Sequence, residues 1–183
     1  QSLVFVCEDD LWWADLEGGV AQRLTAAPGR CRTPHFSPCG RFLAYTGRDE
    51  GQSEVYLLDL NGGEPRRLTF LGADTMVVGF SPDGEWIYYT SNEGQPFLRI
   101  HALGRVARGG GPHQRLPWGP AASLAFQPDG PGRVLGRHTW DTARWKRYRG
   151  GTVGQFWIDK QGKDDWQALR PGGGNLTSPL WLG

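Results

Sequence analysis

The sequence has little of what marks several common classes of protein. It contains three cysteines in 183 residues, Cys7, Cys31 and Cys39, and none of them forms a Cys-x-x-Cys pair. This argues against a disulfide framework or a zinc site and favours a reducing compartment. No apolar run approaches the roughly 20 residues that span a bilayer, and no basic, apolar and small-residue leader begins at Gln1. We therefore expect a cytoplasmic protein that has no membrane partner.

An excess of charge and the common catalytic motifs are also missing. Twenty Lys and Arg residues against 19 Asp and Glu residues give a formal net charge of +1, which argues against a nucleic acid partner. There is no His-Glu-x-x-His zinc motif and no Gly-x4-Gly-Lys phosphate loop, and Gly51–Val55 departs from the Gly-x-Ser-x-Gly nucleophile elbow at its last position. We predict no catalytic residue, no metal ligand and no cofactor-binding residue in this chain.

Glycine, proline and tryptophan are abundant instead. The chain has 28 glycines, 13 prolines and nine tryptophans. Because large aromatic surfaces are normally buried, the tryptophans argue against disorder. Many short strands separated by Gly/Pro turns would give this composition.

An internal repeat is the most informative feature of the sequence. Three markers recur in a fixed order. The first is Phe-x-Pro-x-Gly, which occurs 44 and then 46 residues apart at Phe36–Gly40, Phe80–Gly84 and Phe126–Gly130. The second is Arg-Leu-Thr or Arg-Leu-Pro, at Arg23–Thr25, Arg67–Thr69 and Arg115–Pro117. The third is the Asp-Leu-x-Gly-Gly turn, at Asp15–Gly19 and Asp59–Gly63.

The elements predicted within each period are short strands. Thr75–Ser81, Glu85–Ser91 and Phe97–Ala102 are rich in β-branched or aromatic residues and are bounded by turn residues. In the Pro-Asp-Gly turn, Pro presets φ, Asp accepts a local backbone N–H and Gly supplies a positive φ. The run from Glu85 to Thr90 is bulky on both faces, so both faces of its sheet must be covered. Four such strands per period are typical of β-propeller blades.

The predicted fold is therefore an all-β propeller of four-stranded antiparallel blades in an incomplete, open ring over residues 1–183. We expect an incomplete first blade over residues 1–27, with strands at Leu3–Cys7, Leu11–Asp15 and Ala21–Thr25. Complete blades follow over 28–71, 72–118 and 119–171, and then the first strand of a further blade, Leu176–Leu182, within 172–183. Open blade edges and bare blade faces associate readily, so we expect a homo-oligomer formed through them.

The repeat resembles that of the TolB-like and peptidase-associated propellers, and it lacks the Trp-Asp and Gly-His dipeptides of WD40 blades. Val134–Asp159, and above all its Trp-Lys-Arg-Tyr-Arg-Gly-Gly-Thr stretch, resembles the first propeller of tricorn proteases. Phe5–Leu16 and the closing Asn-Leu-Thr-Ser-Pro-Leu-Trp-Leu-Gly are similar to the same domain. The resemblance covers the whole chain. It implies most of blades one to four and the first strand of blade five of a six-bladed propeller.

This resemblance carries an expected function. Tricorn proteases cut oligopeptides released by upstream proteolysis, using a serine and a histidine in C-terminal domains that no part of this chain resembles. It implies a non-catalytic portion that shapes a channel for peptide access or exit, with oligopeptides as partners of the parent enzyme. Two alternatives are an independent TolB-like protein-binding propeller, which would carry an export signal and end with its propeller, and the propeller of an acylaminoacyl-peptidase-type enzyme.

Cations and aromatics are interleaved in one insertion of the fourth period. The candidates for peptide contact or loop anchoring are Arg137, His138, Arg144, Trp145, Lys146, Arg147, Tyr148 and Arg149. Such residues bind nucleic acid, bind peptide carboxylates, or pack as cation–π pairs that hold a long loop against its blade. The balanced charge of the whole chain favours packing. His35 precedes the repeat motif in the inner strand of a blade. It is a candidate channel-lining residue, unless it is simply packed within its blade.

Overall fold

All regular secondary structure in the described part of the chain is β-strand. The structure, a computed structural model, describes residues 1–138, 153–169 and 176–181. It contains fifteen strands there in four antiparallel sheets and no helix, so these residues contain no helix that could cross a membrane. The predicted all-β fold is confirmed.

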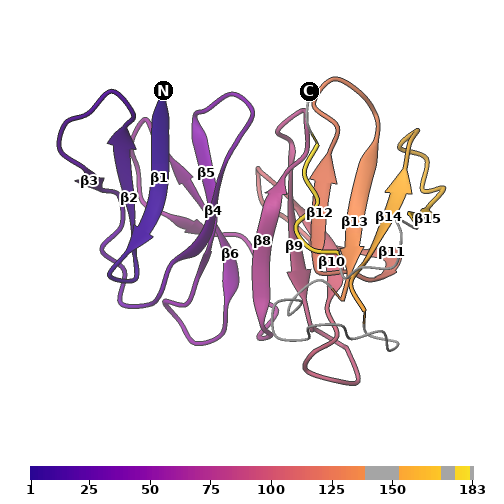
Figure 1. Cartoon of the computed structure of the whole chain (residues 1–183). Coiled ribbons are helices and arrows are strands. Elements are labelled where there is room, and N and C mark those ends of the chain that lie inside the picture. Colours follow the sequence, from indigo (N-terminus) through magenta and orange to yellow (C-terminus); the bar gives the residue numbers. More distant parts are fainter. Residues whose placement is uncertain (139–152, 170–175, 182–183) are drawn as a thin grey trace.

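The sheets follow the chain without crossovers, and we call them blades one to four (Figure 1). Blade one consists of β1 (Ser2–Cys7), β2 (Asp10–Asp15) and β3 (Gln22–Arg23). Blade two consists of β4 (Arg32–Phe36), β5 (Phe42–Gly47), β6 (Glu54–Asp59) and β7 (Arg66–Arg67). Blade three consists of β8 (Thr75–Phe80), β9 (Trp86–Ser91), β10 (Ala102–Ala107) and β11 (Gln114–Pro120). Blade four consists of β12 (Ser123–Phe126), β13 (Arg133–Arg137), β14 (Gln155–Asp159) and β15 (Gln167–Leu169).

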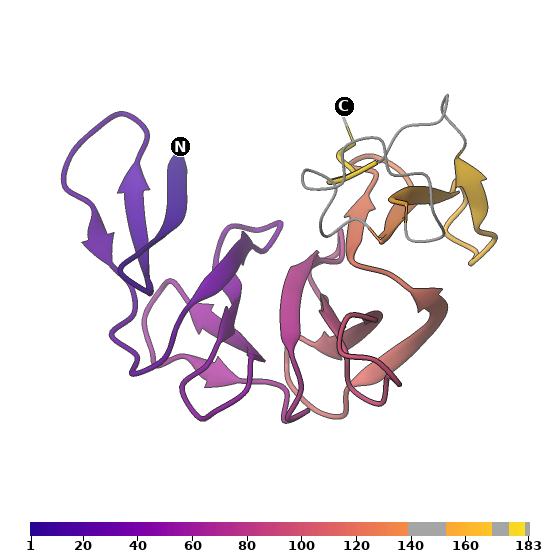
Figure 2. The same ribbon diagram turned by 60° about the horizontal axis from the view of Figure 1, so that its bottom comes forward.

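The four blades follow one another along an arc, and blades one and four do not meet (Figure 2). Within the arc, β4 contacts β8 and β8 contacts β12. The first strands of blades two, three and four are therefore neighbours across the blade boundaries. The ring is open, as predicted.

The core is divided into three clusters, one between each pair of consecutive blades. Between blades one and two lie Leu11, Cys31, Leu43, Tyr45, Tyr56 and Leu58. Between blades two and three lie Ala44, Val55, Leu57, Leu68, Val77, Phe80, Ile87, Tyr89 and Val106. Between blades three and four lie Tyr88, Leu103, Trp118, Ala121, Leu124 and Leu135.

Strand β9 shows why each blade needs two neighbours. Ile87 and Tyr89 enter the cluster shared with blade two, whereas Tyr88 enters the cluster shared with blade four. All three side chains are buried, and burying each large side chain stabilises the fold by about 1.5–3 kcal/mol. The prediction that both faces of this strand are covered is confirmed.

The Phe-x-Pro-x-Gly marker closes the hairpin between the first two strands of a blade. In blade three the Ser81 N–H donates to the Trp86 carbonyl over 2.8 Å. The Ser81 hydroxyl accepts the Trp86 N–H over 2.9 Å, and Gly84 has a φ of +74°. The Asp83 carboxylate accepts the Glu85 N–H over 3.0 Å, as predicted.

The two other copies of this turn make the same pair of bonds, with a serine again in blade two and a glutamine in blade four. In blade two, Ser37 makes the equivalent pair of bonds to Phe42, and Cys39 stands in the position of the aspartate. A hydrogen bond from Ser37 lowers the pKa of the Cys39 thiol. In blade four the Gln127 side chain accepts the Gly132 N–H over 3.2 Å.

The Arg-Leu-Thr marker satisfies a buried carboxylate. In blade two, Glu54 is fully buried. Its carboxylate accepts the Thr69 hydroxyl over 2.6 Å, Arg67 Nη2 over 3.2 Å and the Gly72 N–H over 2.8 Å. The Thr69 hydroxyl in turn accepts the Val55 N–H over 2.9 Å. A buried carboxylate is tolerated when its oxygens are paired in this way.

Blade one repeats this arrangement and blade three omits it. In blade one the Thr25 hydroxyl donates to Asp10 over 2.8 Å and accepts the Leu11 N–H over 2.9 Å, and Arg23 also bonds to Asp10. In blade three the register places Ala102 at the position of Glu54, and the sequence has Pro117 in place of the threonine. Because the acid and the hydroxyl are both absent from blade three, neither group is present there without its partner.

The strand predicted at Phe97–Ala102 is wrong. The third strand of blade three is β10, which pairs with β9 from Ala102 opposite Ser91 to Ala107 opposite Trp86. Residues 97–100 instead form a turn in which the Ile100 N–H donates to the Phe97 carbonyl over 3.0 Å. In β10, Gly104 leaves room for the Tyr89 ring, since a Cβ there would lie 2.5 Å from Tyr89 Cζ. Register against β9 outweighs the local strand propensity of the aromatic and branched residues.

The strand predicted at Leu176–Leu182 does not form over residues 176–181, and Leu182 lies outside the described residues. This segment crosses blade four. The Leu176 N–H donates to the Gly154 carbonyl over 3.2 Å, and the Trp181 ring lies beside Gly132. A strand requires a neighbouring strand for its backbone bonds, and among the described residues this segment pairs with no strand.

The end of blade three also differs slightly from the prediction. Strand β11 extends to Pro120, past the predicted boundary at residue 118.

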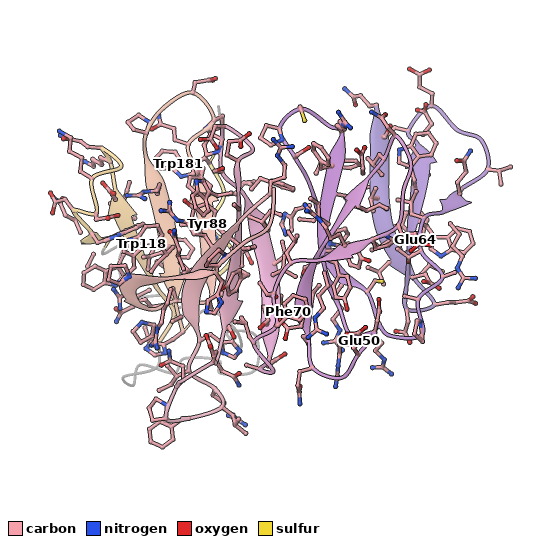
Figure 3. The ribbon with its side chains drawn as sticks, turned by 180° about the vertical axis from the view of Figure 1, so that it is seen from behind. Glu50, Glu64, Phe70, Tyr88, Trp118 and Trp181 are labelled. Carbon is pink, nitrogen blue, oxygen red and sulfur yellow. The ribbon has the colours of Figure 1, made fainter. Side chains whose placement is uncertain are left out.

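We expect Thr69→Val to lower the free energy of unfolding by about 1–3 kcal/mol, because it leaves the Val55 N–H unpaired and takes one donor from Glu54. The side chains are close in shape, so packing is little changed. Glu64→Gln, in an exposed connection (Figure 3), is the control and should change the free energy of unfolding by less than about 0.5 kcal/mol. Urea denaturation followed by circular dichroism measures both. Equal stability of the two variants would show that the bonds at Thr69 contribute nothing.

Candidate functional site between blades three and four

Two of the eight candidates in the insertion lie within the described residues. They are Arg137, the last residue of β13, and His138, which follows it. The other six lie outside the described residues: Arg144, Trp145, Lys146, Arg147, Tyr148 and Arg149. His138 is exposed and has a φ of +54°, a left-handed conformation in which His is among the enriched residues. The chain therefore turns sharply as it leaves the strand.

Arg137 connects blade four to blade three. Its guanidinium carbon lies 4.6 Å from the centre of the Trp157 ring on β14. Its Nη2 donates to the Trp118 carbonyl on β11 over 2.9 Å. Burial lowers the pKa of Arg137. The cation–π contact lies within blade four, and the hydrogen bond to Trp118 joins blade four to blade three. A role of Arg137 in anchoring the insertion remains a prediction.

A second arginine on the same face of β13 continues the contact. The Arg133 guanidinium lies 4.7 Å from the Trp118 ring centre and 5.3 Å from that of Trp166. It also pairs with Asp159 and, over 2.8 Å, with Asp164. The predicted site did not include this cluster. Its tryptophans belong to different periods of the repeat, so no local sequence pattern connects them with Arg133.

Asp159 is the buried acid of this cluster. Burial disfavours its charged form, but hydrogen bonds from Arg133 and from the Asp164 and Lys163 amides favour that form. The hydrogen bonds prevail, so the pKa of the Asp159 carboxyl is lowered. A carboxyl whose pKa is lowered by folding stabilises the fold at pH values above the pKa that it has in the unfolded chain. This contribution is lost as the pH falls through the pKa that the carboxyl has in the folded chain.

His35, the candidate for the channel, lies on β4 and is half-buried. A side chain at Gly79 on β8 would begin 3.9 Å from the His35 Nδ1. Burial lowers the pKa of His35, which favours the neutral imidazole. The residue therefore faces the inner strand of the next blade, and its role in lining a channel remains a prediction.

Among the described residues, no group of three or more His, Cys, Asp or Glu residues could hold a metal ion. The cavity beside Tyr89, Glu93 and Arg115 has a volume of about 10 Å³, roughly the room that one water needs. The arrangement between blades three and four joins the two blades through Arg133 and Arg137.

We expect Arg137→Met to lower the free energy of unfolding by about 1–2 kcal/mol, because the cation–π contact is lost and the Trp118 carbonyl loses its donor. Tryptophan fluorescence during urea denaturation reports on this interface directly. Arg32→Met, at an exposed position on β4, is the matched control and should leave the transition unchanged. If Arg137→Met and Arg32→Met have the same free energy of unfolding, the contacts of Arg137 do not stabilise the interface between blades three and four.

Comparison with known proteins shows the same domain throughout. The family described as the tricorn protease N-terminal beta propeller domain matches residues 1–183. Tricorn protease homolog 1 of Streptomyces coelicolor is 38% identical over 99% of this chain and 17% of its own length. Tricorn protease of Thermoplasma acidophilum is 36% identical over 86% of this chain and 15% of its own length.

A shorter relative is also similar. The putative tricorn-like protease N-terminal subunit of Sulfurisphaera tokodaii is 30% identical over 85% of this chain and 80% of its own length.

The solved structures give the same result. The crystal structure of the tricorn protease matches all of this chain with a TM-score of 0.83 and 32% identity, over 18% of that protein. A putative TolB from Agrobacterium tumefaciens matches 92% of the chain, and 59% of its own, with a TM-score of 0.67 and 21% identity, which shows a shared fold only. The chain spans about one sixth of the length of the long curated relatives. It belongs to the tricorn protease family, as a portion of the N-terminal β-propeller domain.

Proposed function

We propose that this chain is the non-catalytic propeller portion of a tricorn-like serine peptidase that degrades oligopeptides produced by larger proteases. One observation carries the proposal, namely the match of residues 1–183 to the tricorn protease N-terminal beta propeller family, and the match to the tricorn protease structure at a TM-score of 0.83 agrees with it. In that protein the matched part is 18% of the chain. Catalysis would then belong to the remainder of the parent protein.

The proposed role of the propeller is to shape a channel for peptide access or exit. The contacts from β4 to β8 and from β8 to β12 support this role, because they place the first strands of three blades side by side on the inner part of the arc. We assign His35 to the lining of that channel. We also assign peptide contact to Arg137 and His138 at the end of β13, and to the cations that follow them in the sequence.

We place the protein in the cytoplasm. The three cysteines are free thiols, which fits a reducing compartment. Cys7 and Cys39 are exposed and Cys31 is buried.

Hydrolysis assays test the proposed function. The chain alone should cleave fluorogenic oligopeptides no faster than buffer does, whereas the parent protein should cleave them. The peptidase activity of the parent protein should be lost when that protein reacts with a serine-directed phosphonate. Cleavage by the chain alone that is lost on substitution of one of its own serines would overturn the assignment. An intact parent with no peptidase activity would overturn it as well.

We further propose that the isolated chain forms a homo-oligomer through its open blade edges or faces. Among the described residues, blade one has three strands where the others have four, and β1 pairs only with β2. On β1, Val4 packs toward blade two, so the neighbouring Leu3 points to the opposite, uncovered face and is exposed. Such an edge is a template for association.

Size exclusion with light scattering tests the assembly. The unmodified chain should be larger than a monomer at micromolar concentration, and Leu3→Lys should shift it toward the monomer because edge charges oppose pairing. Val20→Lys, in the exposed turn between β2 and β3, should not. A monodisperse monomer of the unmodified chain would rule out this assembly.

A further inference from the structure

An Asn-Gly dipeptide lies in the connection between β6 and β7, on which Glu64 is labelled in Figure 3. The Gly62 N–H donates to the Asp59 carbonyl over 3.1 Å, and the Asn61 N–H donates to Asp59 Oδ1 over 3.0 Å. Gly62 has a φ of +122°, which glycine adopts at little cost because it has no Cβ. Asn61, Gly62 and Gly63 are all exposed. The dipeptide is therefore held in a tight turn that water reaches.

Blade one has the same turn with a different side chain. There the Gly18 N–H donates to the Asp15 carbonyl over 3.2 Å, and the Glu17 N–H donates to Asp15 Oδ1 over 3.0 Å. Gly18 has a φ of +111°. The two turns agree in their backbone bonds and in the conformation of the glycine, and a glutamate in blade one stands where blade two has Asn61. The turn itself therefore does not require an asparagine.

The side chain of Asn61 also differs in its bonding from that of Asn92, the other asparagine within the described residues. Asn92 is held through both atoms of its amide, because Nδ2 donates to the Leu98 carbonyl over 3.1 Å and Oδ1 accepts the Asp74 N–H over 2.9 Å. Among the described residues, no hydrogen bond fixes the side-chain amide of Asn61. Asn92 is followed by Glu93, whereas Asn61 is followed by a glycine. Asn61 alone combines a free side chain with an uncrowded backbone nitrogen next to it.

These features are the ones that conversion of an asparagine through a cyclic imide requires. The Gly62 nitrogen, after giving its proton to hydroxide, attacks Asn61 Cγ. The N–Cγ bond forms, the Cγ–Nδ2 bond breaks, and ammonia leaves with a proton from water, which regenerates the hydroxide. Water then opens the imide at Cγ to give aspartate, or at the backbone carbonyl carbon to give isoaspartate. The sum consumes a water and releases an ammonia, and nothing is oxidised or reduced.

The attack requires the hydrogen bond from Gly62 to Asp59 to open. Hydrogen bonds in exposed turns open at a lower free-energy cost than those of core strands. The missing Cβ of Gly62 then leaves its nitrogen accessible and permits the backbone rotation that brings it to Asn61 Cγ. We propose that Asn61 is a site of spontaneous deamidation, with water as the co-reactant and aspartate and isoaspartate at position 61 as the products.

Formation of isoaspartate changes the path of the chain into β7. This strand consists of Arg66 and Arg67 only, so its place beside β6 depends on the connection over residues 60–65. Arg66 donates to the carbonyls of Arg108 and Gly109 in blade three over 2.7 and 2.9 Å, and Arg67 bonds to the buried acid of blade two. In isoaspartate the main chain runs through Cβ and Cγ and is longer by a methylene. The modification therefore loosens the contact between blades two and three at β7.

Peptide mapping by mass spectrometry after incubation in mildly alkaline buffer tests the site. We expect the peptide that contains Asn61 to gain the mass that replacement of NH₂ by OH gives, at a rate that rises in proportion to the hydroxide concentration. An isoaspartate methyltransferase should label the product. Asn92 is the internal control and should convert at least about tenfold more slowly, because Glu93 crowds its backbone nitrogen and its amide is bonded. Equal rates at Asn61 and Asn92, or a mass gain without isoaspartate, would overturn the proposal.

The substitution Asn61→Glu separates the added charge from the added methylene. It gives blade two the turn sequence of blade one, and it leaves no side-chain amide to be lost. Hydrogen exchange at the Arg66 and Arg67 amides reports on β7. We expect this exchange to be faster in the incubated unmodified chain than in the fresh chain, and Asn61→Glu to match the fresh chain before and after incubation. Unchanged exchange in protein that carries isoaspartate, or equally fast exchange in Asn61→Glu, would overturn the effect of the added methylene on β7.

Discussion

The structure depends on one constraint, which is that every sheet is apolar on both faces and therefore must be covered twice. Alternate residues of β9 show the constraint directly, because Tyr88 packs toward blade four and Tyr89 toward blade two. A single blade has no core of its own. Stability then arises at the interfaces between neighbours, as in other repeat architectures, and the two outermost faces are left without that contribution.

The most visible motifs of the sequence serve the constraint by fixing the backbone within each blade. The Ser81 turn holds the first two strands in register, and the Thr69 hydroxyl joins the segment after the fourth strand to Val55 and to the buried Glu54 of the third strand. Because these bonds are local, a blade can lose a set of them when both partners are replaced. Blade three does so with Ala102 and Pro117, and it relies on the aromatic and cation–π contacts of Trp118 with its neighbours instead.

The sequence was sufficient to predict the propeller, because the repeat, the turn residues and the two-sided apolar strands all follow from local physical chemistry. It was insufficient wherever a contact between strands decided the outcome. Phe97–Ile100 has higher strand propensity than Ala102–Ala107, yet the register with β9 selects the latter. The contact of Arg133 with Trp118 crosses a blade boundary. It could not be predicted from a repeat that describes one blade at a time.

The distribution of exposed residues separates structure from function in this chain. The residues that recur from one period to the next close turns, pack in the cores or bond to buried acids, so their recurrence reflects the constraint on the sheets. Residues 92–101 form a longer connection than the equivalent residues of blades one and two, and they expose Phe97 and Leu98, although the blade that carries them has both faces covered. Phe97 and Leu98 add no apolar burial to the blade that carries them. Their presence therefore does not follow from the constraint on the sheets.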